Sequence, residues 1–147
     1  MKTIALRFGE HFAPPCGTIA AHQEIIQELG YVWYGKMGST VSEKIRSEIM
    51  ESETKKILLI NSGKFDRYWA NIVEIKNETP EVNGIPQYYR DKTEKFKTWF
   101  KVISFEAAPK NIMSKCCVVS SGVVLGEASK RSMSPYFIIE YPEELSV

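Results

Sequence analysis

Residues 31–38, YVWYGKMG, place three aromatic side chains, one lysine and two glycines between two segments that have helical patterns. Aromatic and β-branched residues favour extended backbone, so residues 31–36 are predicted to form a strand. Successive side chains of a strand point to opposite faces of the sheet. Trp33 and Tyr34 therefore diverge, and one of the two rings can enter the core while the other faces a cleft or solvent.

The residues on either side of this strand predict one helix each. Upstream, Thr18 is the expected N-cap and Gly30 the expected C-cap of a helix. Downstream, residues 40–43, TVSE, match the capping box, in which a threonine and a glutamate each bind an otherwise unpaired backbone N–H. Apolar residues then recur every four positions, which predicts an amphipathic helix over residues 41–49.

Strand patterns dominate the rest of the chain, and residues 77–87 are a proline- and glycine-containing loop. Besides residues 31–36, strands are predicted at residues 3–8, 56–61, 67–76, 98–105 and 136–141, with residues 116–124 as a further candidate. Each parallel crossover needs a dozen or more residues, so about six strands with two helices predict a mostly antiparallel sheet. We expect a single α+β domain over residues 1–147, with a small, strongly bent sheet or barrel whose open ends are covered by the two helices.

Composition indicates an ordinary globular domain and excludes several classes of protein. The chain has 147 residues, 44% of them hydrophobic and 25% charged, and its longest apolar runs are too short to cross a bilayer. The N-terminus differs from a signal peptide, and three cysteines, two of them adjacent, do not suggest a disulfide framework. These features predict a cytoplasmic protein with no membrane partner.

The formal net charge of +1 argues against a protein that coats duplex nucleic acid by charge alone. Basic residues are nevertheless concentrated in two places. Residues 88–101, YYRDKTEKFKTWFK, carry five basic and two acidic side chains among aromatic ones, and residues 129–132 form a second basic segment. Either segment can be a solvated surface or a contact for phosphate.

Few residues have the spacing of a catalytic or metal-binding motif. His11 and His22 lie far apart with no CxxC pair, so we expect no metal and no cofactor. Glu74, Glu106 and Glu140 each lie near the end of a predicted strand. A pair of them would suit a small hydrolase or nuclease, which remains an alternative to a non-catalytic protein.

The aromatic residues suggest a binding site for a flat ligand. Trp33, Trp69 and Trp99 each lie within a predicted strand, with basic residues nearby. If these indoles converge, they form a slot in which a nucleobase can stack, at roughly 1–3 kcal/mol per base. The alternatives are that the rings pack in the core, or that they form a flat apolar patch that binds another protein.

The nucleic-acid hypothesis assigns three kinds of role. Stacking is predicted for Trp33 with Trp69 or Trp99, assisted by tyrosines. Loop serines are predicted to contact the edge of the base, and basic side chains to contact phosphate. The full set of predicted binding residues is Trp33, Tyr34, Lys36, Ser39, Trp69, Tyr88, Arg90, Lys97, Trp99 and Ser121.

The order of the predicted elements resembles that of the EVE domain and its relatives in the PUA-like superfamily. Three short patterns carry the resemblance: Trp33-Tyr34-Gly35-Lys36 (W-x-G-K), Ser62-Gly63-Lys64 between two strands, and Trp99-Phe100-Lys101 (W-F-K). The resemblance implies a small barrel that reads a modified base in RNA or DNA.

One feature of the EVE pattern is missing, because the first strand runs into residues 8–12, FGEHF, in place of a Lys-Ser-Glu-Pro type of signature. Only the idea of an aromatic cage is therefore carried over, onto the three tryptophans with their neighbouring tyrosines. The sequence does not specify the base, the choice between RNA and DNA, or the oligomeric state.

Overall fold

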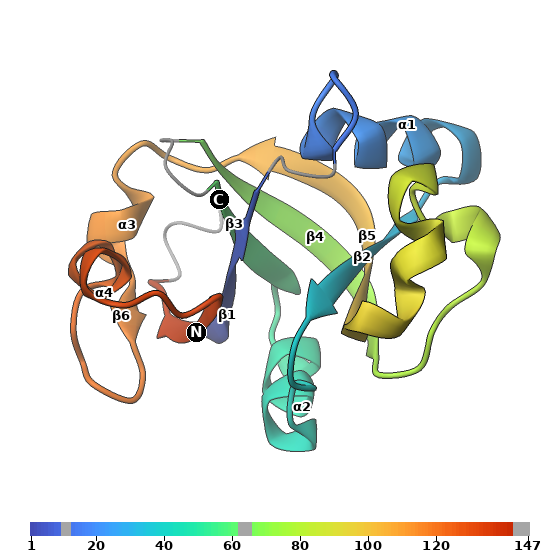
Figure 1. Cartoon of the computed structure of the whole chain (residues 1–147). Coiled ribbons are helices and arrows are strands. Elements are labelled where there is room, and N and C mark those ends of the chain that lie inside the picture. Colours follow the sequence, from blue (N-terminus) through green and yellow to red (C-terminus); the bar gives the residue numbers. More distant parts are fainter. Residues whose placement is uncertain (10–12, 62–65, 143–147) are drawn as a thin grey trace.

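The computed structural model describes residues 1–9, 13–61 and 66–142, and within them the strands form one curled, open, mixed sheet (Figure 1). Seven strands lie in the order β2-β5-β4-β3-β1-β7-β6. Neighbouring strands are antiparallel except β1 and β3, which are parallel and are connected through α1, β2 and α2. The strands are β1 Lys2–Phe8, β2 Val32–Met37, β3 Lys56–Asn61, β4 Arg67–Lys76, β5 Phe96–Ala107, β6 Cys117–Val118 and β7 Tyr136–Glu140.

The sheet curls at its two longest strands. The β4–β5 register shifts between Asn71 and Ile72 and again between Ile72 and Glu74, and the β2–β5 register shifts after Lys36. Such irregularities bend a strand and increase its twist. The half-barrel stays open, with β2 and β6 at its two edges.

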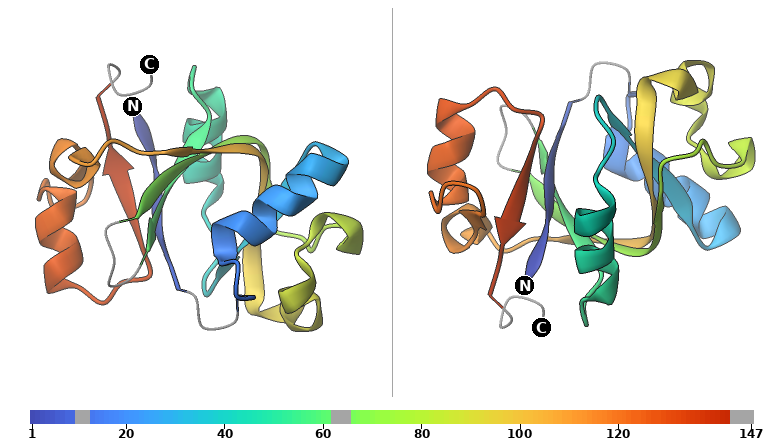
Figure 2. Two further views of the ribbon diagram at one scale, coloured as in Figure 1. Left: turned by 90° about the horizontal axis from the view of Figure 1, so that it is seen from above. Right: turned by 90° about the horizontal axis from the view of Figure 1, so that it is seen from below.

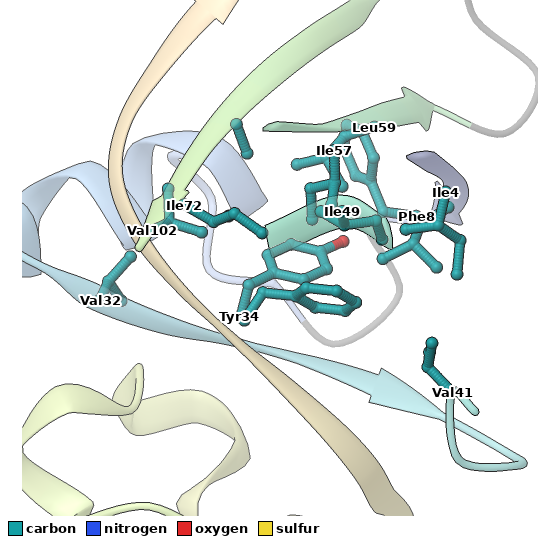
Figure 3. Packing of buried hydrophobic residues seen from close by; sticks show 13 residues of the cluster. Ile4, Phe8, Val32, Tyr34, Val41, Ile49, Ile57, Leu59, Ile72 and Val102 are labelled. Carbon is teal, nitrogen blue, oxygen red and sulfur yellow. The ribbon is translucent and has the colours of Figure 1, made fainter. Parts of the chain in front are cut away.

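Helices lie on both sides of the sheet (Figures 1 and 2). The α-helices are α1 Thr18–Leu29, α2 Glu43–Glu51, α3 Ile112–Lys115 and α4 Leu125–Arg131, and the 3-10 helices are η1 Val82–Gly84 and η2 Gln87–Lys95. One apolar cluster joins one face of the sheet to α1 and α2, and Figure 3 shows Tyr34, Ile49 and Ile57 pointing into it from β2, α2 and β3. A second cluster joins the opposite face to α3 and α4.

The α+β class and the mostly antiparallel, strongly bent sheet are confirmed, whereas several details were predicted wrongly. The helix N-caps are Gly17 for α1 and Ser42 for α2, in place of Thr18 and Thr40. Ser42 Oγ accepts a hydrogen bond from the backbone N–H of Ile45 at 3.3 Å. Gly30 is the predicted left-handed C-cap, with φ of 84°.

The C-terminal part of the chain is more helical than predicted. In place of a strand over residues 116–124, the two-residue β6 is followed by a turn that contains Gly122 at a φ of 73°. Helices α3, α4, η1 and η2 were not predicted. The predicted Ser62-Gly63-Lys64 turn and residues 10–12 lie outside the described residues. No helix in the described ranges combines the length and the apolar character needed to cross a membrane.

Candidate functional site

A pocket of about 260 Å³ lies where the end of β1, the start of α1, β2 and η2 meet. Figure 2 (left) shows the ends of β1 and β2 and the start of β5 on the same side of the molecule. Aromatic rings and cations from segments far apart in the sequence line this pocket. The rings are those of Phe8, His22, Tyr34, Tyr88, Tyr89 and Phe96, and the cations are Arg7, Lys36 and Lys92.

His22 and Tyr89 join α1 to η2 in the wall of the pocket. His22 is fully buried, and its Nδ1 lies 2.7 Å from the carbonyl oxygen of Thr18. Because a carbonyl oxygen only accepts, Nδ1 carries the proton, and Nε2 accepts from the Tyr89 hydroxyl at 2.5 Å. Burial lowers the pKa of His22 to about 4, so the imidazole is neutral at pH 7.

Two of the three cations are bound by neutral acceptors. The guanidinium of Arg7 donates to the carbonyl oxygens of Ser134, Ser129 and Ser132 at 2.8, 2.6 and 2.8 Å. Lys36 Nζ donates to the carbonyl oxygen of Ser39 at 2.6 Å. Burial lowers the pKa of Lys36, since desolvation disfavours its charged form.

The third cation, Lys92, contacts the carboxylate of Asp91 at 3.2 Å, but Asp91 is 80% exposed and does not line the pocket. No aspartate or glutamate is among the described residues that line it. Carbonyl dipoles orient a cation without cancelling its charge. The Arg7 guanidinium lies 5.5 Å from the centre of the Phe137 ring, in the cluster under α3 and α4, so it faces away from the pocket rings. Lys36 and Lys92 still leave the described lining more basic than acidic, which is compatible with an anionic group.

Gly35 explains the W-x-G-K pattern physically. A Cβ at this position would lie 2.7 Å from Phe96 Cδ1 and 3.0 Å from Trp99 Cζ3. Only glycine lets these two rings lie directly on the backbone of β2. The first of the rings lines the pocket and the second supports it from behind.

The three tryptophans do not line one slot, so this prediction was wrong. Trp33 and Trp99 are 5% and 0% exposed and belong to a buried cluster with Tyr89, behind the pocket wall. Trp69 lies in the cluster under α3 and α4, with its ring 5.2 Å from that of Tyr141. Lys56 Nζ lies 4.2 Å from the centre of the Trp69 ring, so a cation of the protein itself already occupies the face of this ring.

The other predicted binding residues divide into two groups. Tyr34, Lys36 and Tyr88 line the pocket. The side chains outside the pocket are those of Ser39, Arg90, Lys97 and Ser121, all of which are exposed. Arg90 Nε donates to the carbonyl oxygen of Ile85 at 2.8 Å, and Ser121 Oγ accepts from the N–H of Val123 at 3.2 Å.

Sequence reasoning missed several residues of the pocket. These are chiefly Arg7, His22, Tyr89, Lys92 and Phe96. Tyr89, Lys92 and Phe96 lie inside the basic and aromatic segment 88–101, which was the available signal. No sequence signal marked Arg7 or His22 as a pocket residue, because only the tertiary fold brings them to the same place.

The strand-end carboxylates lie elsewhere. Glu74, Glu106 and Glu140 are exposed side chains on β4, β5 and β7, and none of them lines the pocket. Glu106 accepts a hydrogen bond from Asn71 Nδ2 at 2.7 Å. Within the part of the chain that the structure describes, no three His, Cys, Asp or Glu side chains are grouped as metal ligands would be.

Comparison with known protein families matches residues 4–134 to the Pua-like family. No curated protein and no solved structure matched the chain. The matched range covers most of the chain and contains the greater part of the pocket lining. The chain belongs to the Pua-like family.

Proposed function

We propose that this protein binds nucleic acid by taking one base, with its phosphate, into the pocket between β1, α1, β2 and η2, and that it does not itself catalyse a reaction. Pua-like domains typically bind RNA or other nucleic acid. The observation that carries the proposal is the composition of the pocket, in which six aromatic rings meet Lys36 and Lys92 and no carboxylate is among the described lining residues. A nucleotide has the matching parts, a flat heterocycle and an anion.

The hydrogen bonds within the pocket suggest how such a base is recognised. His22 and Tyr89 bind each other and the Thr18 carbonyl oxygen, so their polar groups are already paired inside the protein. Recognition then depends mainly on stacking and on shape, which tolerates any base that fits between the rings. A volume of about 260 Å³ lies just below the usual range for ligand pockets, which suits one nucleotide unit. A modified base, as the resemblance implies, is the finer form of this proposal.

The shape of the site favours this function over a protein-interaction module. A module of that kind would present its aromatic residues as a flat exposed patch. Here the rings line a hollow, and the indoles of Trp33 and Trp99 are almost completely covered. The arrangement therefore supports a small planar ligand over a second protein surface.

Replacing Tyr88 by alanine should weaken the binding of a single-stranded oligonucleotide by about 5- to 150-fold, which corresponds to the roughly 1–3 kcal/mol of one base–aromatic stack. Tyr88 lines the pocket, and its ring lies 4.7 Å from that of Tyr89. Fluorescence anisotropy with labelled RNA and DNA of the same sequence measures the effect.

Tyr31→Ala is the matched control for this experiment. Tyr31 packs on the same buried aromatic cluster but does not line the pocket, so its truncation should change affinity by less than about twofold. Equal reductions in affinity for the two variants, or an unchanged affinity for Tyr88→Ala with the protein still folded, would contradict the proposed base pocket.

Removing the charge of Lys92 should reduce both the affinity and its dependence on salt. For a single strand, the slope of log K against log salt becomes shallower by about 0.7 for each phosphate that the protein no longer neutralises. Lys92→Gln is expected to show this change. Lys97→Gln removes the same charge from a side chain outside the pocket and should leave the slope unaltered. If Lys97→Gln gives the larger change, the phosphate lies over the exposed face of β5, as the sequence predicted.

A further inference from the structure

Lys36 is a buried lysine in the wall of the pocket, although lysine is almost never buried without a partner of opposite charge. The residue is 5% exposed. Its Nζ donates to the carbonyl oxygens of Met37 and Ser39 at 3.2 and 2.6 Å. Among the described residues, no aspartate or glutamate forms an ion pair with it. The fold therefore holds this amine with neutral groups alone.

The amine lies at the end of the pocket that β1 and the start of β7 form. Tyr34, two positions earlier on β2, faces the same side of the sheet and points into the apolar cluster of Figure 3. Lys36 Nζ lies 4.3 Å from the centre of the Tyr136 ring. Tyr136 is paired with Leu6 in the sheet, and both Leu6 and Pro135 line the pocket. The surroundings of Nζ thus belong to the pocket lining.

A row of aromatic rings connects this end of the pocket to Lys92 on η2. The ring centres of Tyr34 and His22 are 5.0 Å apart, and those of His22 and Tyr88 are 6.4 Å apart. Lys92 Nζ donates to the carbonyl oxygen of Tyr88 at 3.3 Å, and its side chain is 24% exposed. The pocket therefore has a buried amine at one end, a partly exposed cation at the other and aromatic rings between them.

The surroundings of Lys36 suit covalent chemistry with a carbonyl compound. Only the neutral form of a lysine is a nucleophile, and burial in a hydrophobic pocket increases its fraction. Burial lowers the pKa of Lys36. The face of the Tyr136 ring and the two carbonyl oxygens favour a cation at Nζ. A protonated imine, which lysine forms with an aldehyde, is also a cation, so the same groups would stabilise it.

We propose that the pocket binds an aromatic aldehyde that carries an anionic group, and that Lys36 joins this aldehyde as an imine. The ring stacks along the row of aromatic side chains, and the anionic group contacts Lys92. The lysine nitrogen forms a double bond to the aldehyde carbon, and the carbon–oxygen bond breaks. The oxygen leaves as water with two of the three protons of the ammonium, so the imine keeps one proton and the positive charge. No oxidant or reductant takes part.

This inference goes beyond the proposed function and does not depend on it, although both ligands would occupy the same pocket. Pyridoxal phosphate is the probe, because it combines a flat ring, an aldehyde and a phosphate. After mixing at equal concentrations, borohydride reduces the imine to a stable amine, and mass spectrometry identifies the labelled peptide. The label should be on Lys36. It should be absent with pyridoxine phosphate, which has an alcohol in place of the aldehyde.

Three variants test the roles of the two lysines. Lys36→Arg should lose the label, because a guanidinium keeps the charge but does not form this imine. Lys44→Arg is the matched control, since Lys44 is exposed on α2 outside the pocket, and it should keep the full label. Lys92→Gln should weaken the binding of pyridoxal phosphate by about tenfold or more, through loss of a charged hydrogen bond. The same variant should not affect labelling by benzaldehyde, which has no anionic group.

The possible results separate this proposal from the proposed function. A label spread over the exposed lysines, a label on Lys92, or no label at all on the unaltered protein would overturn the imine site. These results do not depend on the folding of Lys36→Arg. A label on Lys36 in a protein that binds no oligonucleotide would leave the imine site in place and overturn the proposed function. Oligonucleotide binding without a label on Lys36 would do the reverse.

Discussion

Replacing Trp99 by alanine should lower the free energy of unfolding by about 3–5 kcal/mol, the usual cost of truncating a buried tryptophan. Its side chain is fully buried, and its ring lies 5.3 Å from that of Phe96 and 6.3 Å from that of Tyr89. These two neighbours line the pocket, so a cavity behind them should also loosen its wall. Urea denaturation followed by circular dichroism measures the change in stability.

Trp99→Phe separates support of the wall from direct contact with the ligand. The indole Nε1 of Trp99 is buried without a hydrogen-bond partner among the described residues, which is itself unfavourable by about 1–3 kcal/mol. Phenylalanine removes this N–H along with some volume, so Trp99→Phe should cost much less stability than Trp99→Ala and leave oligonucleotide affinity within about twofold. A lower affinity with unchanged stability would show that the indole itself stacks on the base, as the sequence suggested.

Trp69→Ala is the matched control, because it truncates an equally buried indole in the other apolar cluster. It should destabilise the protein by a similar amount without a specific effect on the pocket. If Trp69→Ala and Trp99→Ala weakened binding equally at temperatures where both proteins are folded, the aromatic cluster behind the pocket would have no special role.

The strands could be predicted because their signal is local. Residues 67–76 form β4 as predicted, since a run of β-branched and aromatic residues favours extended backbone wherever it is placed. Helices α3 and α4 have four and seven residues. Such lengths are too short to show a helical period, and packing against the sheet stabilises them. The turn at Gly122, which ends β6, depends equally on its surroundings.

The grouping of the aromatic residues was harder to predict because register decides which face of a sheet a side chain occupies. A shift of one residue moves a side chain to the opposite face, and β4 shifts its register twice between Asn71 and Glu74. Trp69 precedes these irregularities and packs under α3 and α4. Lys76 follows them, and its Nζ lies 4.8 Å from the centre of the Trp33 ring. The spacing within the sequence does not reveal such shifts.

The pocket residues divide in the same way, into those that a local sequence pattern marks and those that only the tertiary fold brings together. Tyr34 and Lys36 were predicted, because the W-x-G-K pattern marks their strand. His22 and Tyr89, which bind each other, are 67 positions apart, and Arg7 binds a carbonyl oxygen 125 positions away. Only the completed fold brings such partners together.

Acid should destabilise this protein through His22, by roughly 3 kcal/mol between pH 6.5 and pH 4. The pKa of this imidazole is about 4 in the folded protein, against 6.5 when it is exposed, because burial disfavours its charged form. Between these two values the unfolded chain binds more protons than the folded one. The free energy of unfolding therefore falls as the pH falls, and it is constant with respect to this group above pH 6.5.

His22→Gln provides the comparison that isolates this group, because glutamine is neutral at every pH in the window. The variant should be less stable at pH 7, where it lacks the packed imidazole, but its stability should fall less steeply from pH 6.5 to pH 4. Urea denaturation at intervals of one pH unit measures both slopes. Parallel slopes for the two proteins would mean that His22 does not bind a proton in this range, and that the acid sensitivity arises from carboxylates elsewhere in the chain.

A protonated His22 also affects the pocket, since it would add a positive charge to a lining that already holds Lys36 and Lys92. The Nε2 atom now accepts from the Tyr89 hydroxyl, and a proton on Nε2 would force that hydroxyl to accept instead. The carbonyl oxygen of Trp33, 3.5 Å from the hydroxyl, is the nearest alternative acceptor for the displaced hydroxyl proton. Tyr89→Phe removes the hydroxyl and so leaves Nε2 of His22 without this partner in both protonation states.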